Sequence, residues 1–178
     1  IDTYNFYSSN VKNMSYMFER AGRLASTWSV GYLADWNVSN VTNMARMFCG
    51  TATSATTFDI GNLDNWDGSN VEIMGSLFNS TGYSATTWNV GDLSGWNVSS
   101  VEDMGYMFNA AGQNATTWGV GDLSNWDTSN VTSMEAMFAG TGVNATTWTS
   151  FGNLKVYADN VIAMFYSSPK ANGNILLY

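Results

Sequence analysis

The side chains that most often perform nucleophilic or acid–base chemistry are scarce in this chain. It contains no histidine, which excludes histidine-based triads, histidine general bases and histidine metal ligands. Cys49 is the single cysteine, so no internal disulfide can form, and no histidine is present to activate its thiol. We therefore expect Cys49 to be a surface or half-buried thiol and not a nucleophile.

The acidic side chains are the remaining candidates for catalysis or metal binding. Glu102 and Asp103 are adjacent, and Asp92 and Asp122 lie one sequence repeat apart. A glycosidase needs two carboxylates that face each other across a cleft, and no feature of the sequence places a pair in that way. Calcium could bind between stacked aspartates, but the motif GGxGxD that holds it in repeat proteins is absent. The sequence therefore predicts a non-enzymatic protein without a cofactor or a metal.

The charge balance limits the partners. Lysine and arginine total 6 against 14 aspartates and glutamates, for a formal net charge of −8, and no lysine or arginine lies between Met47 and Leu154. A phosphate backbone or an anionic membrane surface needs a basic footprint, so we expect neither as a partner. No apolar run approaches the roughly 20 residues of a membrane span. The chain begins at Ile1 without an initiator methionine or a signal peptide, and we expect this residue to follow processing or trimming.

These side chains must be positioned by a sequence that repeats itself every 30 residues. Identical side chains at a fixed period indicate that stacked repeats share one core. Two columns hold all the tryptophans: Phe6, Trp36, Trp66, Trp96 and Trp126, and Trp28, Phe58, Trp88, Trp118 and Trp148. Two columns hold all the methionines: Met14, Met44, Met74, Met104, Met134 and Met164, and Met17, Met47, Leu77, Met107 and Met137.

Each repeat is expected to contain a short helix. In the stretch SNVTSMEAMF, Val131, Met134, Met137 and Phe138 recur at intervals typical of one helix face. Capping-box pairs would begin such helices and glycines would end them: Ser69 with Glu72, Ser99 with Glu102, and Gly22, Gly82, Gly112 and Gly142. A helix this short is not stable alone, so it must bury its methionines and phenylalanines against neighbouring elements.

A strand is expected after each helix, because Trp88 and Val90 alternate with Thr87 and Asn89. Stacking of these units predicts an α/β solenoid of 30-residue repeats, each a short helix plus a strand, with a parallel sheet on one side. We assign residues 1–178 to a single repeat domain. It has five clear repeats from about residue 6 and a degenerate C-terminal capping repeat at about residues 149–178.

The repeated aromatic and amide columns have a structural explanation. The tryptophans and methionines are expected to form a continuous core, and a sugar-binding tryptophan platform is a minor alternative. A column of asparagines is expected to bond backbone groups between coils: Asn10, Asn40, Asn70, Asn130 and Asn160. The Asn-X-Ser/Thr triplets follow from the same lattice and are weak evidence for glycosylation.

The stretch LSNWDTSNVTSMEAMF (residues 123–138) resembles the repeat of the BspA-like leucine-rich-repeat surface proteins. The recurrent signature of that family is W-D-T-S-N-V-T-x-M-x-x-M-F, and the likeness extends from Phe6 to about Phe165. It implies a right-handed, leucine-rich-repeat-like coil and a secreted or cell-surface bacterial protein, often adhesive; members also occur in bacteriophage. The family shares no catalytic residues, so the resemblance implies none here.

Columns that vary between repeats are candidates for recognition. One reads Tyr16, Arg46, Ser76, Tyr106 and Ala136, and another reads Arg23, Thr53, Tyr83, Gln113 and Val143. Exposed aromatic side chains are common interface anchors, so Tyr16, Tyr83 and Tyr106 are the predicted contacts for a protein or glycan ligand. Simple tolerance of a solvated surface is the favoured explanation of the variation at any single position.

Threonines form a further regular surface: Thr27, Thr57, Thr87, Thr117 and Thr147. Strand stacking would space them about 4.8 Å apart, an arrangement similar to that of ice-binding solenoids. Those proteins favour two outward threonine columns. One column is expected here, so ice binding is a minor alternative.

The C-terminal end of the chain is an apolar run, the N-terminal end carries Ile1, Tyr4 and Phe6, and neither end has the lysines that often blunt a sheet edge. The N-terminal stretch is IDTYNFY and the C-terminal stretch is NILLY. The alternative function is therefore a structural subunit of an extracellular fibre, stacked head to tail through Ile1, Tyr4, Leu176, Leu177 and Tyr178. The opposing possibility is that NILLY folds back and seals the last coil as a true cap.

Overall fold

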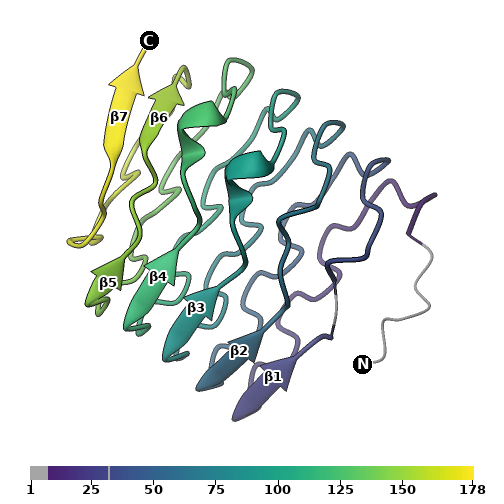
Figure 1. The fold of residues 1–178 in the computed structure, drawn as a ribbon, viewed down its shortest axis with the longest axis vertical. Helices are drawn as coiled ribbons and strands as arrows, with labels where there is room; N and C mark the ends of the chain where they lie inside the picture. Colours follow the sequence, from purple (N-terminus) through teal and green to yellow (C-terminus); the bar gives the residue numbers. More distant parts are fainter. Residues whose placement is uncertain (1–7, 32) are drawn as a thin grey trace.

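A computed structural model describes residues 8–31 and 33–178 of the chain. The described part is a stack of 30-residue units in which equivalent segments lie side by side (Figure 1). Strands and turns make up the units, with two short 3-10 helices, η1 (Leu93–Gly95) and η2 (Leu123–Asn125), as the only helical segments among the described residues. Ile1 and Tyr4, which were predicted to take part in assembly, lie outside the described residues.

The strand predicted in each repeat is present, although it is short. The first five strands are β1 (Thr27–Ser29), β2 (Thr57–Asp59), β3 (Thr87–Asn89), β4 (Thr117–Gly119) and β5 (Thr147–Trp148). They lie in order along one side of the stack (Figure 1) and pair in parallel as β1-β2 and as β3-β4-β5. The register is one full repeat, so that Thr27 faces Thr57 and Trp88 faces Trp118.

The predicted short helix is absent, and a ribbon of consecutive turns takes its place at about residues 13–24 and at the equivalent positions of later units. In the fourth unit the amide of Asn109 donates to the Tyr106 carbonyl three residues back, at 3.1 Å. Alternate amides donate to backbone carbonyls of the next coil: the Tyr106 amide to Glu135 at 2.7 Å, and the Ala110 amide to Ala139 at 2.7 Å. We call this segment the turn ribbon.

Left-handed residues explain why the turn ribbon is not a helix. Tyr106 has φ 58° and Ala110 has φ 52°, conformations that cannot continue a right-handed helix. Gly112 is left-handed as expected, with φ 51°, but it closes a turn before the strand instead of a helix. Each reversal of φ turns a backbone amide along the stack, where a neighbouring coil accepts its hydrogen bond. The helix prediction was therefore wrong because the apolar spacing fits both structures and the neighbouring coils supply the acceptors.

The core assignment is confirmed. Met104 and Trp118 are fully buried and Trp96 is nearly so. Equivalent rings stack from coil to coil, with centroids 6.2 Å apart for Trp66 and Trp96. A phenylalanine column does the same through the turn ribbon, at 5.2–5.7 Å between neighbours: Phe18, Phe48, Phe78, Phe108, Phe138 and Phe165. The tryptophans therefore serve the core and do not form an exposed sugar platform.

The asparagine column also acts as predicted. The side-chain amide of Asn70 donates to the Ser39 carbonyl at 2.6 Å, and Asn130 donates to Ser99 at 2.7 Å. Ser100 occupies the same column and its hydroxyl makes the equivalent bond to Ser69 at 2.7 Å. The prediction was wrong for Asn160, because the last coil is out of the 30-residue register and Asn160 pairs with Ser133 instead of following Asn130. Its side-chain amide donates to the Glu135 carboxylate at 3.0 Å. This ladder ties successive coils together on a surface that is otherwise exposed.

The C-terminal unit ends in two further parallel strands, β6 (Asn153–Val156) and β7 (Asn174–Leu177). The segment NILLY thus forms β7 and continues the stack, as Figure 1 shows at its yellow end. Leu177 pairs with Val156 but is 73% exposed. The segment therefore adds one more strand to the stack and leaves Leu177 exposed.

Candidate functional site

The three tyrosines predicted to bind a partner are all exposed, at 55% for Tyr16, 37% for Tyr83 and 39% for Tyr106. Tyr16 and Tyr106 lie at equivalent positions of the turn ribbon, and both are left-handed, with φ 61° and 58°. Tyr83 lies seven positions further along its own coil and does not reach the depression described next. The structure therefore groups two of the three predicted contacts on one surface.

A depression of about 580 Å³, here named the ribbon groove, lies on the outer surface of the turn ribbon. Gly75 and Gly105 line it at positions where other coils carry Ala45 and Glu135, and the Asp103 carboxylate lies where side chains on these glycines would begin. Its lining comes from four successive coils: Ala45, Arg46, Gly75, Ser76, Asp103, Gly105, Tyr106, Thr132, Ser133 and Glu135. Two glycines beside the variable column were the sequence signal for this groove, and our reading of the sequence missed it.

At one end of the ribbon groove, neighbouring side chains hold the cationic side chain of Arg46 in place. The guanidinium of Arg46 donates to the Glu19 carboxylate at 2.5 Å and lies 5.6 Å from the centre of the Tyr16 ring. The hydrogen bond that Arg46 donates to Glu19 is the main reason that the pKa of Arg46 lies above its usual value. Tyr16 thus helps to fix the charged side chain of Arg46 in place, in addition to the partner contact predicted for it.

At the other end of the ribbon groove, hydrogen bonds hold the carboxylate of Glu135 in place. The hydroxyl of Tyr106 donates to Glu135, and the side-chain amide of Asn160 donates to the same carboxylate at 3.0 Å. These two bonds lower the pKa of Glu135, with the Tyr106 bond as the larger cause. The same contact raises the pKa of Tyr106. The ribbon groove therefore presents a cation and an anion at fixed positions, over a floor of small residues.

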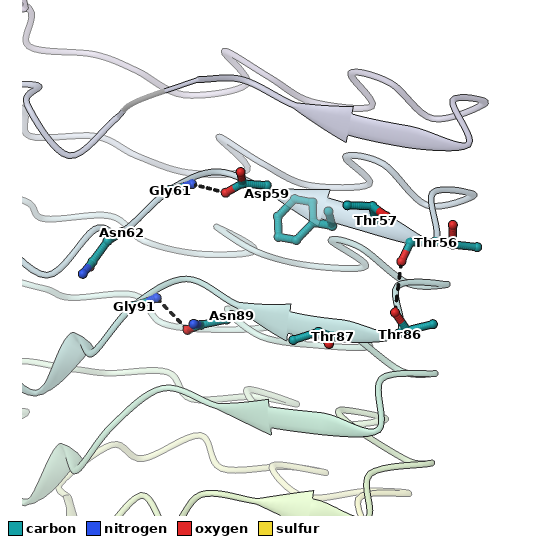
Figure 2. Close-up of a pocket in the computed structure, with 10 residues that line it drawn as sticks. Thr56, Thr57, Asp59, Gly61, Asn62, Thr86, Thr87, Asn89 and Gly91 are labelled. Atoms are coloured by element: carbon teal, nitrogen blue, oxygen red, sulfur yellow. Dashed lines mark hydrogen bonds between the residues drawn. The ribbon is translucent and has the colours of Figure 1, made fainter.

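The strand side of the stack carries a second depression, a cleft of about 340 Å³ that we name the strand cleft. Figure 2 shows it between β2 and β3, with threonines at one end and Asp59, Asn62 and Asn89 toward the other. It is lined by Thr56, Thr57, Phe58, Asp59, Gly61, Asn62, Thr86, Thr87, Asn89 and Gly91. We did not expect a cleft there, because the sequence predicted one continuous sheet.

The strand cleft lies where the sheet is interrupted. β2 pairs with β1 and β3 pairs with β4, but β2 and β3 belong to different sheets. The amide of Val30 donates to the Asp59 carbonyl at 3.3 Å, whereas within the described chain the Ile60 amide makes no such bond to Asn89. The two coils remain joined on either side of the gap, by Thr86 to Thr56 at 3.1 Å and by Leu63 to Val90 at 3.1 Å.

The threonine face differs from the expected single outward column. Two adjacent columns are exposed, because Thr56 and its equivalents lie outward beside Thr57 and its equivalents. The hydroxyls of the first column donate to carbonyls of the preceding coil, as from Thr116 to Thr86 at 3.0 Å. Two outward columns are the feature that ice-binding solenoids favour, but the interruption between β2 and β3 breaks the regular ladder here.

Cys49 and the carboxylates were the side chains that the sequence left as candidates for chemistry. Cys49 is half-buried, and burial is the main cause that raises the pKa of its thiol. Among residues 8–31 and 33–178, no group of three or more cysteine, aspartate or glutamate side chains is arranged to hold a metal ion. The same residues include no helix long and apolar enough to cross a membrane.

Comparison with known proteins places the sequence among repeat proteins. A family model described as "Mycoplasma protein of unknown function, DUF285" matches residues 1–118 and residues 51–178, which together cover the whole chain. No curated protein and no solved structure matches the chain. The repeated, overlapping matches agree with the 30-residue period.

Proposed function

The chain belongs to the DUF285 family, and from that premise we propose that it is a non-catalytic recognition module of a cell-surface protein. Its ligand is a protein or a glycan that is bound in the ribbon groove. The observation that carries the proposal is the groove itself: Arg46 and Tyr106 stand at fixed positions on either side of Gly75 and Gly105. A rigid aromatic beside a fixed charge is the usual composition of a binding hot spot.

The cellular location, the adhesive role and the relation to the leucine-rich repeats are part of the same proposal. The repeat resembles that of the BspA-like surface proteins, which supports a secreted or surface location in a bacterium or a bacteriophage and an adhesive role. It also supports a right-handed coil related to the leucine-rich repeats. The turn ribbon is where this chain departs from a helix-plus-strand repeat, so the relationship rests on the signature and the period.

Binding arrays test the proposal. The 178-residue chain is applied to arrays of defined glycans and of purified extracellular matrix proteins, beside a double variant Arg46→Ser/Tyr106→Ser. We expect at least one ligand to be retained by the parent chain and lost by the double variant at unchanged Tm. Tyr83→Ser is the matched control, because it removes an exposed tyrosine outside the groove. Loss of binding in the control alone would move recognition away from the ribbon groove.

The second candidate is the structural subunit of a fibre. What supports it is the face of the last described coil, which exposes Ile162, Tyr166, Leu177 and Tyr178. In the preceding coil, the backbone amides of Ala136 and Phe138 donate hydrogen bonds to the next coil. The equivalent amides of Ala163 and Phe165 have no backbone acceptor in the described chain. A continuation of the polypeptide or a second copy would supply both the acceptors and the apolar contact.

Light scattering over a concentration series, with electron microscopy of the native material, tests this candidate. Concentration-dependent growth that Leu177→Lys abolishes would support stacking of copies. A particle of constant mass, together with single molecules in the native material, would contradict it.

A further inference from the structure

We propose that the strand cleft is a binding site for a neutral oligosaccharide, whose chain crosses β2, β3 and β4. This site lies on the strand side of the stack, apart from the ribbon groove, and the two proposals stand or fall separately. Its argument rests on three features: the interruption of the sheet, the polar groups that the interruption leaves open, and the charge of the surface.

The interruption coincides with a change in ring stacking beneath it, although Phe58 and Trp88 are both buried in the same core. Trp28 stacks on Phe58 at 6.0 Å and Trp88 stacks on Trp118 at 5.2 Å, but within the described chain Phe58 and Trp88 make no ring contact. Phe58 is the one phenylalanine in a column of tryptophans. The smaller ring therefore marks the interface at which the strands part, so the cleft is built into the sequence of these two coils.

The side chains at the strand cleft offer both hydrogen-bond donors and acceptors. One carboxylate oxygen of Asp59 accepts the Gly61 amide at 2.8 Å, which leaves the other oxygen open. The Asn89 carbonyl oxygen accepts the Gly91 amide at 2.9 Å, which leaves its side-chain amide as a donor. Turn geometry thus holds both side chains in place, and vicinal hydroxyls of a sugar can donate to one and accept from the other.

The threonines complete the rim. The hydroxyls of Thr57 and Thr87 make no hydrogen bond within the described chain, unlike those of Thr56 and Thr86, which bond to carbonyls of the preceding coil. Phe58 adds a small apolar edge to the lining. An alternating polar and apolar ligand surface, such as that of a pyranose ring, matches this lining better than an apolar ligand would.

The negative charge around the strand cleft favours neutral sugars over anionic ones. No lysine or arginine lies between Met47 and Leu154, so the strand cleft contains no cation to pair with a phosphate, a sulfate or a uronic acid. Asp59 and nearby Asp64 and Asp92 would repel such groups. A second depression lies over β3 and β4, where Gly119 has no side chain, and it shares Thr87 and Asn89 with the strand cleft. The ligand is therefore an uncharged chain and not a single anionic sugar.

Calorimetry and amide NMR on the 178-residue chain test the inference with four hexasaccharides. Three are neutral, made of α-1,4-glucose, β-1,4-glucose or β-1,4-N-acetylglucosamine, and the fourth is the anionic hexamer of galacturonate. We expect at least one neutral hexamer to bind and to shift the amides of Thr57, Thr87 and Asn89, while the anionic hexamer does not. Absence of binding by all three neutral hexamers at millimolar concentration would overturn the inference.

Variants locate the site. Thr57→Val/Thr87→Val should weaken binding by about tenfold, because two hydrogen bonds of modest net strength are lost. Phe58→Trp should abolish binding by restoring the ring column and closing the cleft, since other coils accept tryptophan at this position. Thr27→Val is the matched control in the same column outside the cleft. Unchanged affinity in both cleft variants, or a loss caused by Tyr106→Ser instead, would also overturn the inference.

Discussion

At the scale of single residues, the ribbon groove is organised by contacts that fix charged groups. Glu135 accepts hydrogen bonds from Tyr106 in the preceding coil and from Asn160 in the following coil, which lie 29 and 25 positions away in the sequence. Arg46 is held in the same way by Glu19 and Tyr16. These side chains are solvent-exposed, so their pairs contribute little to stability. Their effect is to keep a cation and an anion at a constant separation, which favours selective binding.

The Tyr106–Glu135 contact predicts a pH window. The lowered pKa of Glu135 means that the bond is present above the ordinary glutamate pKa and is lost as the pH falls through the lowered value. The raised pKa of Tyr106 means that it persists at least up to the ordinary tyrosine pKa and is lost as the pH rises further. Glu135→Gln should therefore lower the pKa of Tyr106 toward its usual value, as measured by NMR titration of the phenol carbon. An unchanged Tyr106 titration would show that the pair is not formed in solution.

At the scale of elements, the turn ribbon and the asparagine ladder join the coils. The ribbon satisfies alternate amides within a coil and between coils, whereas a helix would satisfy them only within itself. Each coil therefore depends on its neighbour for its backbone hydrogen bonds as well as for its core. The ladder repeats this on the exposed side, where the Asn70 amide reaches the Ser39 carbonyl.

The asparagine ladder predicts a difference between two substitutions at one position. Asn70→Ala should lower the free energy of unfolding by about 1 kcal/mol, because the bond to Ser39 is lost. Asn70→Ser should retain most of the stability, since Ser100 makes the same bond in the next coil. Urea unfolding of both variants decides the matter, and equal stabilities would mean that the ladder bond contributes nothing.

The left-handed positions of the turn ribbon predict a stabilising glycine. Ala110 has φ 52°, and two equivalent positions, Gly50 and Gly140, are already glycine. Relief of the left-handed strain exceeds the entropic cost of glycine, so Ala110→Gly should raise the free energy of unfolding by about 0.5 kcal/mol. Ala45→Gly is the control, because Ala45 is not left-handed and should lose about 0.5–1 kcal/mol. A loss in both variants, seen by thermal unfolding, would argue against the turn geometry.

At the scale of the whole molecule, stability comes from columns that run the length of the stack. Phenylalanine rings stack through six successive coils. The methionine column from Met14 to Met134 beside them is buried, whereas Met17 of the second methionine column is 40% exposed. Contacts are made only between neighbouring coils, so the loss of one coil removes support from both sides of it.

A buried charge in the methionine column should therefore unfold more than its own coil. Met104 is fully buried, and Met104→Asp should lower the free energy of unfolding by at least about 4 kcal/mol, because the carboxylate has no partner there. Met104→Leu is the matched control and should cost less than about 1.5 kcal/mol. Hydrogen exchange should show faster exchange in the coils before and after the aspartate. Protection that falls only within residues 101–115 would contradict cooperative stacking.

The period, the core columns, the position of each strand and the asparagine ladder could all be read from the chain, because each depends on identical residues recurring every 30 positions. The exposure of Tyr16, Tyr83 and Tyr106 was predicted from the opposite signal, because the residues in their columns vary between repeats. The turn ribbon could not be predicted. Its apolar spacing suits a helix as well, and the choice depends on which carbonyl accepts each amide, which a neighbouring coil decides. The ribbon groove and the strand cleft likewise arise from residues 30 or more positions apart, through Gly75 beside Gly105 and Phe58 beside Trp88, so their shapes exist only once the coils are stacked.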